Sequence, residues 1–175
     1  MPHLYNFMAK TNREISMKRE KAIGEDFNGY SVLMSGGRWD NPGDAKTDKY
    51  LFEDKFTKSD AYVLKNSTLV KIEKQAYFAR RIPIFKVGFT VGDNTENGDE
   101  FIILKDVHCL DEAAFGSGVP VLDVAGKSFK LRRDYLRSTL ENNIYIQLNF
   151  LDTKDYYIVC RYSYLKSNSR LILGK

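Results

Sequence analysis

The stretch Asp44–Thr57, DAKTDKYLFEDKFT, decides the predicted fold. It reads as two strands, residues 44–47 and 49–57, and the turn Thr47-Asp48-Lys49 folds the second strand back beside the first. Side chains alternate between the two faces of a strand. One face of the second strand therefore carries Leu51, Glu53, Lys55 and Thr57, and the other carries Tyr50, Phe52 and Phe56.

The hairpin brings together residue types that could form a metal site. Glu53 and Lys55 point the same way, roughly 6.6 Å apart along the strand, and Asp44 converges on Glu53 from the preceding strand. Two carboxylates at one place suit Mg²⁺ or Mn²⁺, which prefer oxygen ligands. A neighbouring lysine can orient an attacking water and offset the charge of a phosphate. Taken alone, the same pattern also fits a surface ladder of ion pairs.

Working outward from the hairpin, hydrophobic periodicity and turn residues predict the remaining elements up to residue 105. The predicted order is helix, three strands, helix, strand, strand, which indicates an α/β fold with a central mixed sheet flanked by helices. The elements outside the hairpin are a helix over 16–27 ending at Asn28-Gly29, a strand over 30–34, a helix over 67–81 stopped by Pro83, and strands over 84–90 and 101–104.

Beyond residue 105 the sequence predicts a helix over 131–141 and a hairpin formed by 144–150 and 156–162. We therefore divide the chain into an N-terminal arm (1–15), a core (16–105) and a C-terminal helix-hairpin extension packed on the core (106–175). The aromatic residues of the hairpin could pack into the core or contribute to an interface between two copies of the chain. They are Tyr145, Phe150, Tyr156, Tyr157 and Tyr162.

Several short motifs occur in a fixed order along the core. They are Arg19-Glu20-Lys21, Ser35-Gly36-Gly37, Gly43-Asp44, Glu53-Asp54-Lys55-Phe56-Thr57, Leu69 to Ala76, and Ile82-Pro83-Ile84. In this order and spacing, residues 16–105 resemble the archaeal-type Holliday-junction resolvases of the PD-(D/E)xK nuclease superfamily. Gly43 stands where the superfamily's name has a proline.

The resemblance implies a restriction-endonuclease-like core and a catalytic set of Glu20, Asp44, Glu53 and Lys55. It implies that the three carboxylates hold Mg²⁺, for which Mn²⁺ can substitute, and that Lys55 acts on the water or the scissile phosphate. It also implies a homodimer that resolves four-way DNA junctions by paired nicks in recombination and repair, and a compact chain of this kind suits a bacteriophage.

Other acids leave alternatives open at two of these positions. Glu14, Glu25 and Asp26 could take the place of Glu20, and Asp48 could take the place of Asp44. Asp54 raises a separate question, because alternation places it on the aromatic face with Phe52 and Phe56. An ionised carboxylate there is costly unless it meets a cation or solvent.

Basic residues provide a second indication of DNA binding. The chain has a formal net charge of +4, and its cations gather in residues 65–86 and 127–137, as phosphate contacts require. Solvated helix faces would give the same pattern. The predicted DNA-binding residues are Ser35, Arg38, Lys71, Lys74, Lys130, Arg132 and Arg133.

The remaining residues argue against other chemistries. His3 and His108 are the only histidines and lack zinc-ligand or triad companions at recognisable spacing. Cys109 and Cys160 indicate reduced thiols, and no apolar stretch predicts a leader or a membrane span, so we expect a cytoplasmic protein, in the host's cytoplasm if it is phage-encoded. Two alternative functions remain: another PD-(D/E)xK endonuclease acting on duplex DNA, and a DNA-binding module without catalysis.

Overall fold

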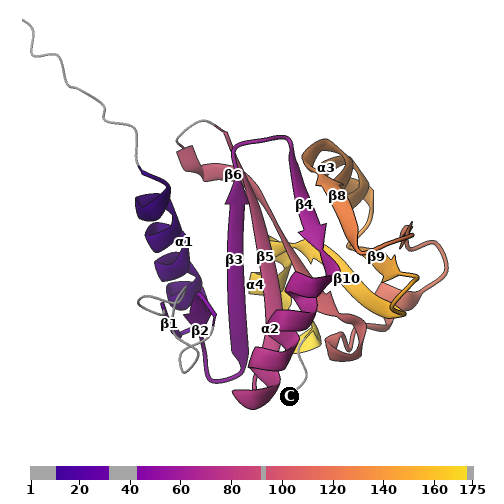
Figure 1. Cartoon of the computed structure of the whole chain (residues 1–175), viewed down its shortest axis with the longest axis horizontal. Coiled ribbons are helices and arrows are strands. Elements are labelled where there is room, and N and C mark those ends of the chain that lie inside the picture. The colour runs from indigo at the N-terminus through magenta and orange to yellow at the C-terminus, as the bar shows by residue number, and fades with distance from the viewer. Residues whose placement is uncertain (1–10, 32–42, 92–93, 173–175) are drawn as a thin grey trace, which may run out of the picture.

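The protein is built around a mixed β-sheet with helices on both faces (Figure 1). The computed structural model describes residues 11–31, 43–91 and 94–172. The strands of this sheet are β1 (Tyr30–Ser31), β2 (Ala45–Lys46), β3 (Tyr50–Thr57), β5 (Ile82–Val91), β6 (Asn94–Lys105), β7 (Val121–Val124), β9 (Tyr145–Phe150) and β10 (Asp155–Arg161). Their spatial order is β1-β2-β3-β5-β6-β10-β9-β7. The predicted α/β class with a mixed, helix-flanked sheet is confirmed.

The sheet is mixed because two neighbouring pairs of strands run parallel. β3 pairs with β5 in parallel, and β7 pairs in the same way with β9, while the other neighbours are antiparallel. The β3–β5 pair needs a crossover, since parallel strands cannot be joined by a tight turn. β6 pairs with β10, so the strands that follow residue 105 continue the same sheet.

A second, two-stranded sheet pairs a strand of this crossover with a strand from the C-terminal part of the chain, and we call it the β4–β8 ribbon. It consists of β4 (Ala61–Lys65) and β8 (Ser128–Arg132), paired antiparallel. The sequence did not predict this ribbon. The predicted helix over 131–141 is wrong at its start, because Leu131 and Arg132 belong to β8 and the helix α3 spans Arg133–Asn142.

The helices divide between the two faces of the sheet. Helices α1 (Asn12–Asp26) and α4 (Tyr162–Ile172) cover one face, where Ile23 and Leu165 pack against Phe52 and Ile102. Helices α2 (Asn66–Phe78) and α3 cover the other face together with the ribbon. Each large apolar side chain buried in these layers contributes roughly 1.5–3 kcal/mol. The short 3₁₀ turns Asp106–His108 and Glu112–Phe115 join β6 to β7.

Helix ends differ from the prediction for local reasons. α1 begins at Asn12 rather than Ser16, because Thr11 and Glu14 form a capping box in which each side chain accepts from the other residue's backbone N–H. α2 ends at Phe78 rather than Arg81. Arg80 there adopts a left-handed backbone with φ of 52°, which ends the helix before Pro83.

Most aromatic residues of the β9–β10 hairpin, together with Tyr162 at the start of α4, pack in the core. Tyr145, Phe150, Tyr157 and Tyr162 are buried, and only Tyr156 of this set is exposed. Packing into the core therefore accounts for four of the five residues, which leaves little of the set for an interface. No helix in the described part of the chain is both long enough and apolar enough to span a membrane.

Candidate active site

The candidate site lies at the edge of β3, where its pairing with β2 stops. The backbone N–H of Asp44 donates to Phe52 O at 2.7 Å, and the Asp44 carboxylate then accepts from the backbone N–H of Asp54 at 2.7 Å. On β3, the register of the short strand β2 covers Leu51 and Phe52 and does not reach Asp54. The side chain of Asp44 thus satisfies a strand donor that β2 leaves unpaired, and this fixes the carboxylate beside Glu53 and Lys55.

The Lys55 ammonium lies where three oxygens converge. Its Nζ is 2.7 Å from Glu53 Oε1, 3.3 Å from Asp44 Oδ2 and 3.2 Å from the backbone oxygen of Asp54. Partial burial would lower the pKa of Lys55, but the negative charges of Asp44 and Glu53 outweigh it and raise the pKa to about 12. Lys55 is therefore a firmly held cation at neutral pH.

Glu20 approaches the same cluster from α1, which packs beside β1, β2 and β3. Partial burial and the negative charges of Asp44 and Asp54 raise the pKa of Glu20 to about 7, against a smaller opposite effect of Lys55. A carboxyl that senses these charges belongs to their electrostatic neighbourhood. The structure thus brings Asp44, Glu53 and Lys55 into contact and places Glu20 within electrostatic reach of them.

The alternative acids are engaged elsewhere. Glu14 belongs to the capping box of α1, and Glu25 forms an exposed ion pair with Lys21. Asp26 accepts from the Tyr162 hydroxyl at 2.8 Å and pairs with Lys166 at 2.6 Å. Asp48 is exposed in the turn between β2 and β3. Glu20 and Asp44 therefore remain the best placed acids of their segments.

Asp54 meets a cation, which answers the question raised by its place on the aromatic face. Arg19 of α1 donates to both of its oxygens, through Nε and Nη2, at 2.7 Å each. Arg19 also lies 2.9 Å from Glu100, and Lys86 joins Glu100 at 2.6 Å and Asp54 at 3.8 Å. Four buried or half-buried charges of balanced sign thus clamp α1 onto β3, β5 and β6. The need of Asp54 for a cation was predictable, but its partners were not, because Arg19, Lys86 and Glu100 are far from it in the chain.

The predicted DNA-binding residues have different surroundings. Lys71 and Lys74 are exposed on α2, and Lys130 and Arg132 are exposed on β8. Arg133 differs from these four residues because it is partly buried and its Nε forms an ion pair with Asp99 at 2.7 Å. Ser35 and Arg38 lie outside the described residues.

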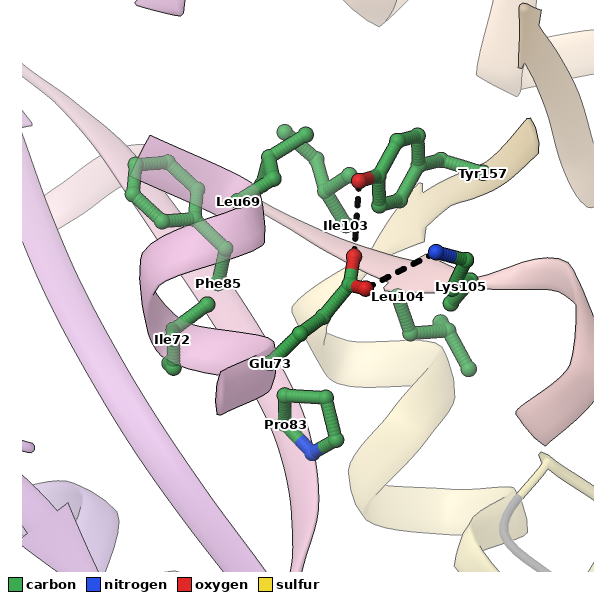
Figure 2. Close-up of a pocket in the computed structure, with 9 residues that line it drawn as sticks. All are labelled: Leu69, Ile72, Glu73, Pro83, Phe85, Ile103, Leu104, Lys105 and Tyr157. Atoms are coloured by element: carbon green, nitrogen blue, oxygen red, sulfur yellow. Dashed lines mark hydrogen bonds and ion pairs between the residues drawn. The ribbon is translucent and has the colours of Figure 1, made fainter. Parts of the chain in front are cut away.

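A separate polar cluster beneath α2 has its groups paired with one another (Figure 2). Glu73 accepts from the Tyr157 hydroxyl at 2.7 Å and from Lys105 Nζ at 2.8 Å, at the border of a small cavity lined by Leu69 and Phe85. Burial and the Glu73 carboxylate raise the pKa of Tyr157. This arrangement stabilises the contact of α2 with β6 and β10 and leaves little room for a ligand.

The donor chemistry of the β3 edge fits a hard cation. As the side chains stand, the described residues hold no group of three His, Cys, Asp or Glu arranged to bind a metal. However, Glu53 Oε1, Asp44 Oδ2 and the Asp54 carbonyl already converge on one positive charge, the Lys55 ammonium. Such oxygens are the ligands that Mg²⁺ takes, and a bound ion there would require the ammonium to move aside.

Comparison of the chain with protein-family models, curated protein sequences and solved structures finds no significant match. The functional argument therefore depends on the site itself.

Proposed function

We propose that this protein is a metal-dependent DNA endonuclease that hydrolyses phosphodiester bonds, with the four-way junction as its substrate. The observation that carries the proposal is the cluster at the β3 edge, where Lys55 is held between Asp44 and Glu53. Beside it, partial burial and the nearby carboxylates, Asp44 first among them, raise the pKa of Glu20. Strongly perturbed groups that gather in one place are typical of functional sites. Apart from the inserted ribbon strand β4, the order α1, β1 to β3, α2, β5 also supports the restriction-endonuclease-like core that the resemblance implies.

The residues divide the work by charge. Asp44, Glu53 and Glu20 would hold Mg²⁺, and the bound ion would supply a water of lowered pKa and offset charge on the phosphate. Because the pKa of Lys55 is about 12, its ammonium stays protonated at neutral pH. Lys55 therefore acts as a cation and not as a general base. Released from Asp44 and Glu53, its ammonium can orient the attacking water or stabilise the charge that develops on the phosphate.

The junction substrate requires two such sites. Resolving a four-way junction takes two symmetric cuts in opposed strands, and one site of this kind cuts one strand. An isologous homodimer is the simplest way to present two identical sites to a two-fold substrate. We therefore propose a homodimer that works on DNA in the cytoplasm and makes paired nicks.

The test is cleavage of a labelled four-way junction and of its separate duplex arms, with Mg²⁺, with Mn²⁺ and with EDTA. We expect cutting that requires the metal, and a loss of at least about 100-fold in each of Asp44→Asn, Glu53→Gln and Lys55→Ala. DNA binding should persist and can tighten in the two carboxylate variants, since removing a negative charge reduces the repulsion of phosphate. Asp48→Asn, which removes an exposed carboxylate close by in the chain, is the matched control and should cut normally.

The outcomes separate the alternatives. Equal cutting of the arms and the junction would favour a duplex endonuclease over a resolvase. Binding without cleavage under all metal conditions would leave a non-catalytic DNA-binding module. Full activity of Glu53→Gln would show that the assigned site is wrong.

A further inference from the structure

The β4–β8 ribbon has one face toward the core and one toward solvent. Its strands pair in the register Ala61↔Arg132, Val63↔Lys130 and Lys65↔Ser128, and directly paired residues share a face. Leu64 and Leu131, one position out of phase with these pairs, are fully buried against the sheet. The outward face therefore carries Ala61, Val63, Lys65, Ser128, Lys130 and Arg132.

The outward face is basic and its cations are uncommitted. Lys65, Lys130 and Arg132 are exposed, and none of them forms an ion pair with any residue that the structure describes. The face contains no acidic residue. By contrast, Arg133 immediately after the ribbon is paired with Asp99, and Lys105 is paired with Glu73. The unpaired cations of the outward face do not stabilise the fold, since Leu64 and Leu131 on the inward face provide the packing of the ribbon.

The ribbon also lies close to the candidate active site. Residues 58–60 alone separate β3 from β4 (Figure 1). On the inward face, the ring of Tyr62 is 6.0 Å from that of Phe85, and Phe85 is the register partner of Glu53 in the β3–β5 pair. Burial raises the pKa of Tyr62, and the charges of Lys55 and Glu53 act on the same hydroxyl in opposite directions. The ribbon is therefore a neighbour of the strand that holds the catalytic candidates.

A surface cleft extends the basic face at one end of the ribbon. Lys65 and Ser128 line it together with Lys127, which also has no ion pair among the described residues, and with Thr153 from the turn between β9 and β10. The cleft thus adds a fourth cation to the three on the ribbon, on the same side of the molecule.

We propose that the outward face of the β4–β8 ribbon binds the phosphate backbone of a duplex arm of the DNA substrate. The inference rests on the proposed nuclease function and names the surface that holds the substrate. Unpaired cations on a rigid two-stranded platform gain affinity by releasing the counterions of DNA. A two-stranded ribbon has the dimensions to enter or border a groove of B-form DNA. Contacts of this kind position the duplex without reading its sequence.

The test compares two triple variants that remove the same charge. The ribbon variant is Lys65→Gln, Lys130→Gln and Arg132→Gln. The control is Arg13→Gln, Lys49→Gln and Arg170→Gln, three exposed cations that lie outside the ribbon and outside the predicted DNA-binding set. Binding to a fluorescent duplex and to a four-way junction is measured by anisotropy in EDTA, over a series of salt concentrations. Thermal melting of both variants checks that these exposed substitutions leave the fold intact.

We expect the ribbon variant to bind at least about 100-fold more weakly near 0.1 M salt, and the slope of log affinity against log salt to fall by about 2–3, since each lost phosphate contact is worth about 0.9. The control variant should retain the wild-type slope. An unchanged slope in the ribbon variant, or a larger loss of affinity in the control variant, overturns the proposal while the nuclease function stands. If the wild-type protein prefers duplex RNA to DNA, or binds neither nucleic acid, both the ribbon proposal and the nuclease function are refuted. If binding depends on the ribbon as expected but no cleavage occurs, only the nuclease function is refuted.

Discussion

Replacing Asp54 by Asn tests how α1 is held against the sheet. The pair of Asp54 with Arg19 is deeply buried, with side chains 2% and 4% exposed, and it contains two hydrogen bonds of 2.7 Å. Removing one partner of such a pair costs about 3–5 kcal/mol, because the other charge stays buried and unpaired. In the variant, Arg19 and Lys86 would share the single carboxylate of Glu100, which is 25% exposed and so partly hydrated. We therefore expect a loss near the lower limit, about 3 kcal/mol.

The assay is urea unfolding with linear extrapolation of the free energy. A loss of about 3 kcal/mol is readily measured, since domains of this size have total stabilities of about 5–15 kcal/mol. Glu25→Gln is the matched control, because it breaks an ion pair with Lys21 whose side chains are 68% and 75% exposed. Exposed pairs of this kind contribute at most about 0.5 kcal/mol.

A double variant separates the charge effect from a packing effect. Arg19→Met combined with Asp54→Leu removes both charges and leaves Lys86 with Glu100 as a balanced pair. Buried ion pairs replaced by apolar groups of similar size are often neutral or stabilising, so this variant should recover most of the lost stability. A loss below about 1 kcal/mol in Asp54→Asn, or a double variant as unstable as the single one, would refute the reasoning.

Two further variants test neighbouring features. Gly88→Ala would place a methyl group against the guanidinium of Arg19, and the ion pairs of Arg19 prevent it from moving away. We therefore expect the free energy of unfolding to fall by about 1–3 kcal/mol in the same urea assay. An unchanged free energy of unfolding would contradict this expectation. Glu20→Gln tests the raised pKa of Glu20, measured by melting in EDTA. The folded protein raises the pKa of Glu20 from its ordinary value of 4.5 to about 7. The stability of the wild-type protein therefore falls as the pH rises through that window. The Gln variant should be as stable as the wild type at pH 4 and more stable than the wild type at pH 8. Solvent screening of this partly exposed carboxyl limits the stability gain of the Gln variant at pH 8 to about 1 kcal/mol. A stability gain that does not depend on pH would contradict the raised pKa of Glu20.

The sequence predicted the part of the fold in which local pattern and tertiary packing agree. In β3, alternation sends Tyr50 and Phe52 toward α1 and Leu51 toward α2, and the burial of all three follows that pattern. The stripe of α2 formed by Leu69, Ile72 and Ala76 was readable for the same reason. These segments bury one face each, so their periodicity is strong.

The elements that were missed have weak or conflicting local signals. In β8, Lys130 and Arg132 alternate with Phe129 and Leu131 over only five residues, and the helix that follows directly made the stretch look helical. The ribbon exists because β8 meets β4, more than sixty residues away, and no local pattern encodes that pairing. The early start of α1 was readable, since Thr11 and Glu14 have capping-box spacing.

The candidate site could be predicted only as far as its residue types allowed. Asp44, Glu53 and Lys55 are close in sequence and share one hairpin, so their convergence followed from strand geometry. Glu20 came only from the resemblance, and the acids near it were distinguished by their contacts in the fold. The salt bridge that places α1 could not be inferred, because Arg19 and Asp54 are 35 residues apart.

The pair of Arg19 and Asp54 also explains why an acid lies on the aromatic face of β3, between the candidate site residues Glu53 and Lys55. Neighbouring residues of a helix point about 100° apart, so fixing the direction of Arg19 fixes that of Glu20, the next residue. Asp54, which fixes Arg19, stands between Glu53 and Lys55 on β3. Alternate residues of one strand therefore have two roles: Glu53 and Lys55 belong to the candidate site, and Asp54 sets the rotation of the helix that carries Glu20. An apolar residue at position 54 would pack as well but would leave that rotation unspecified.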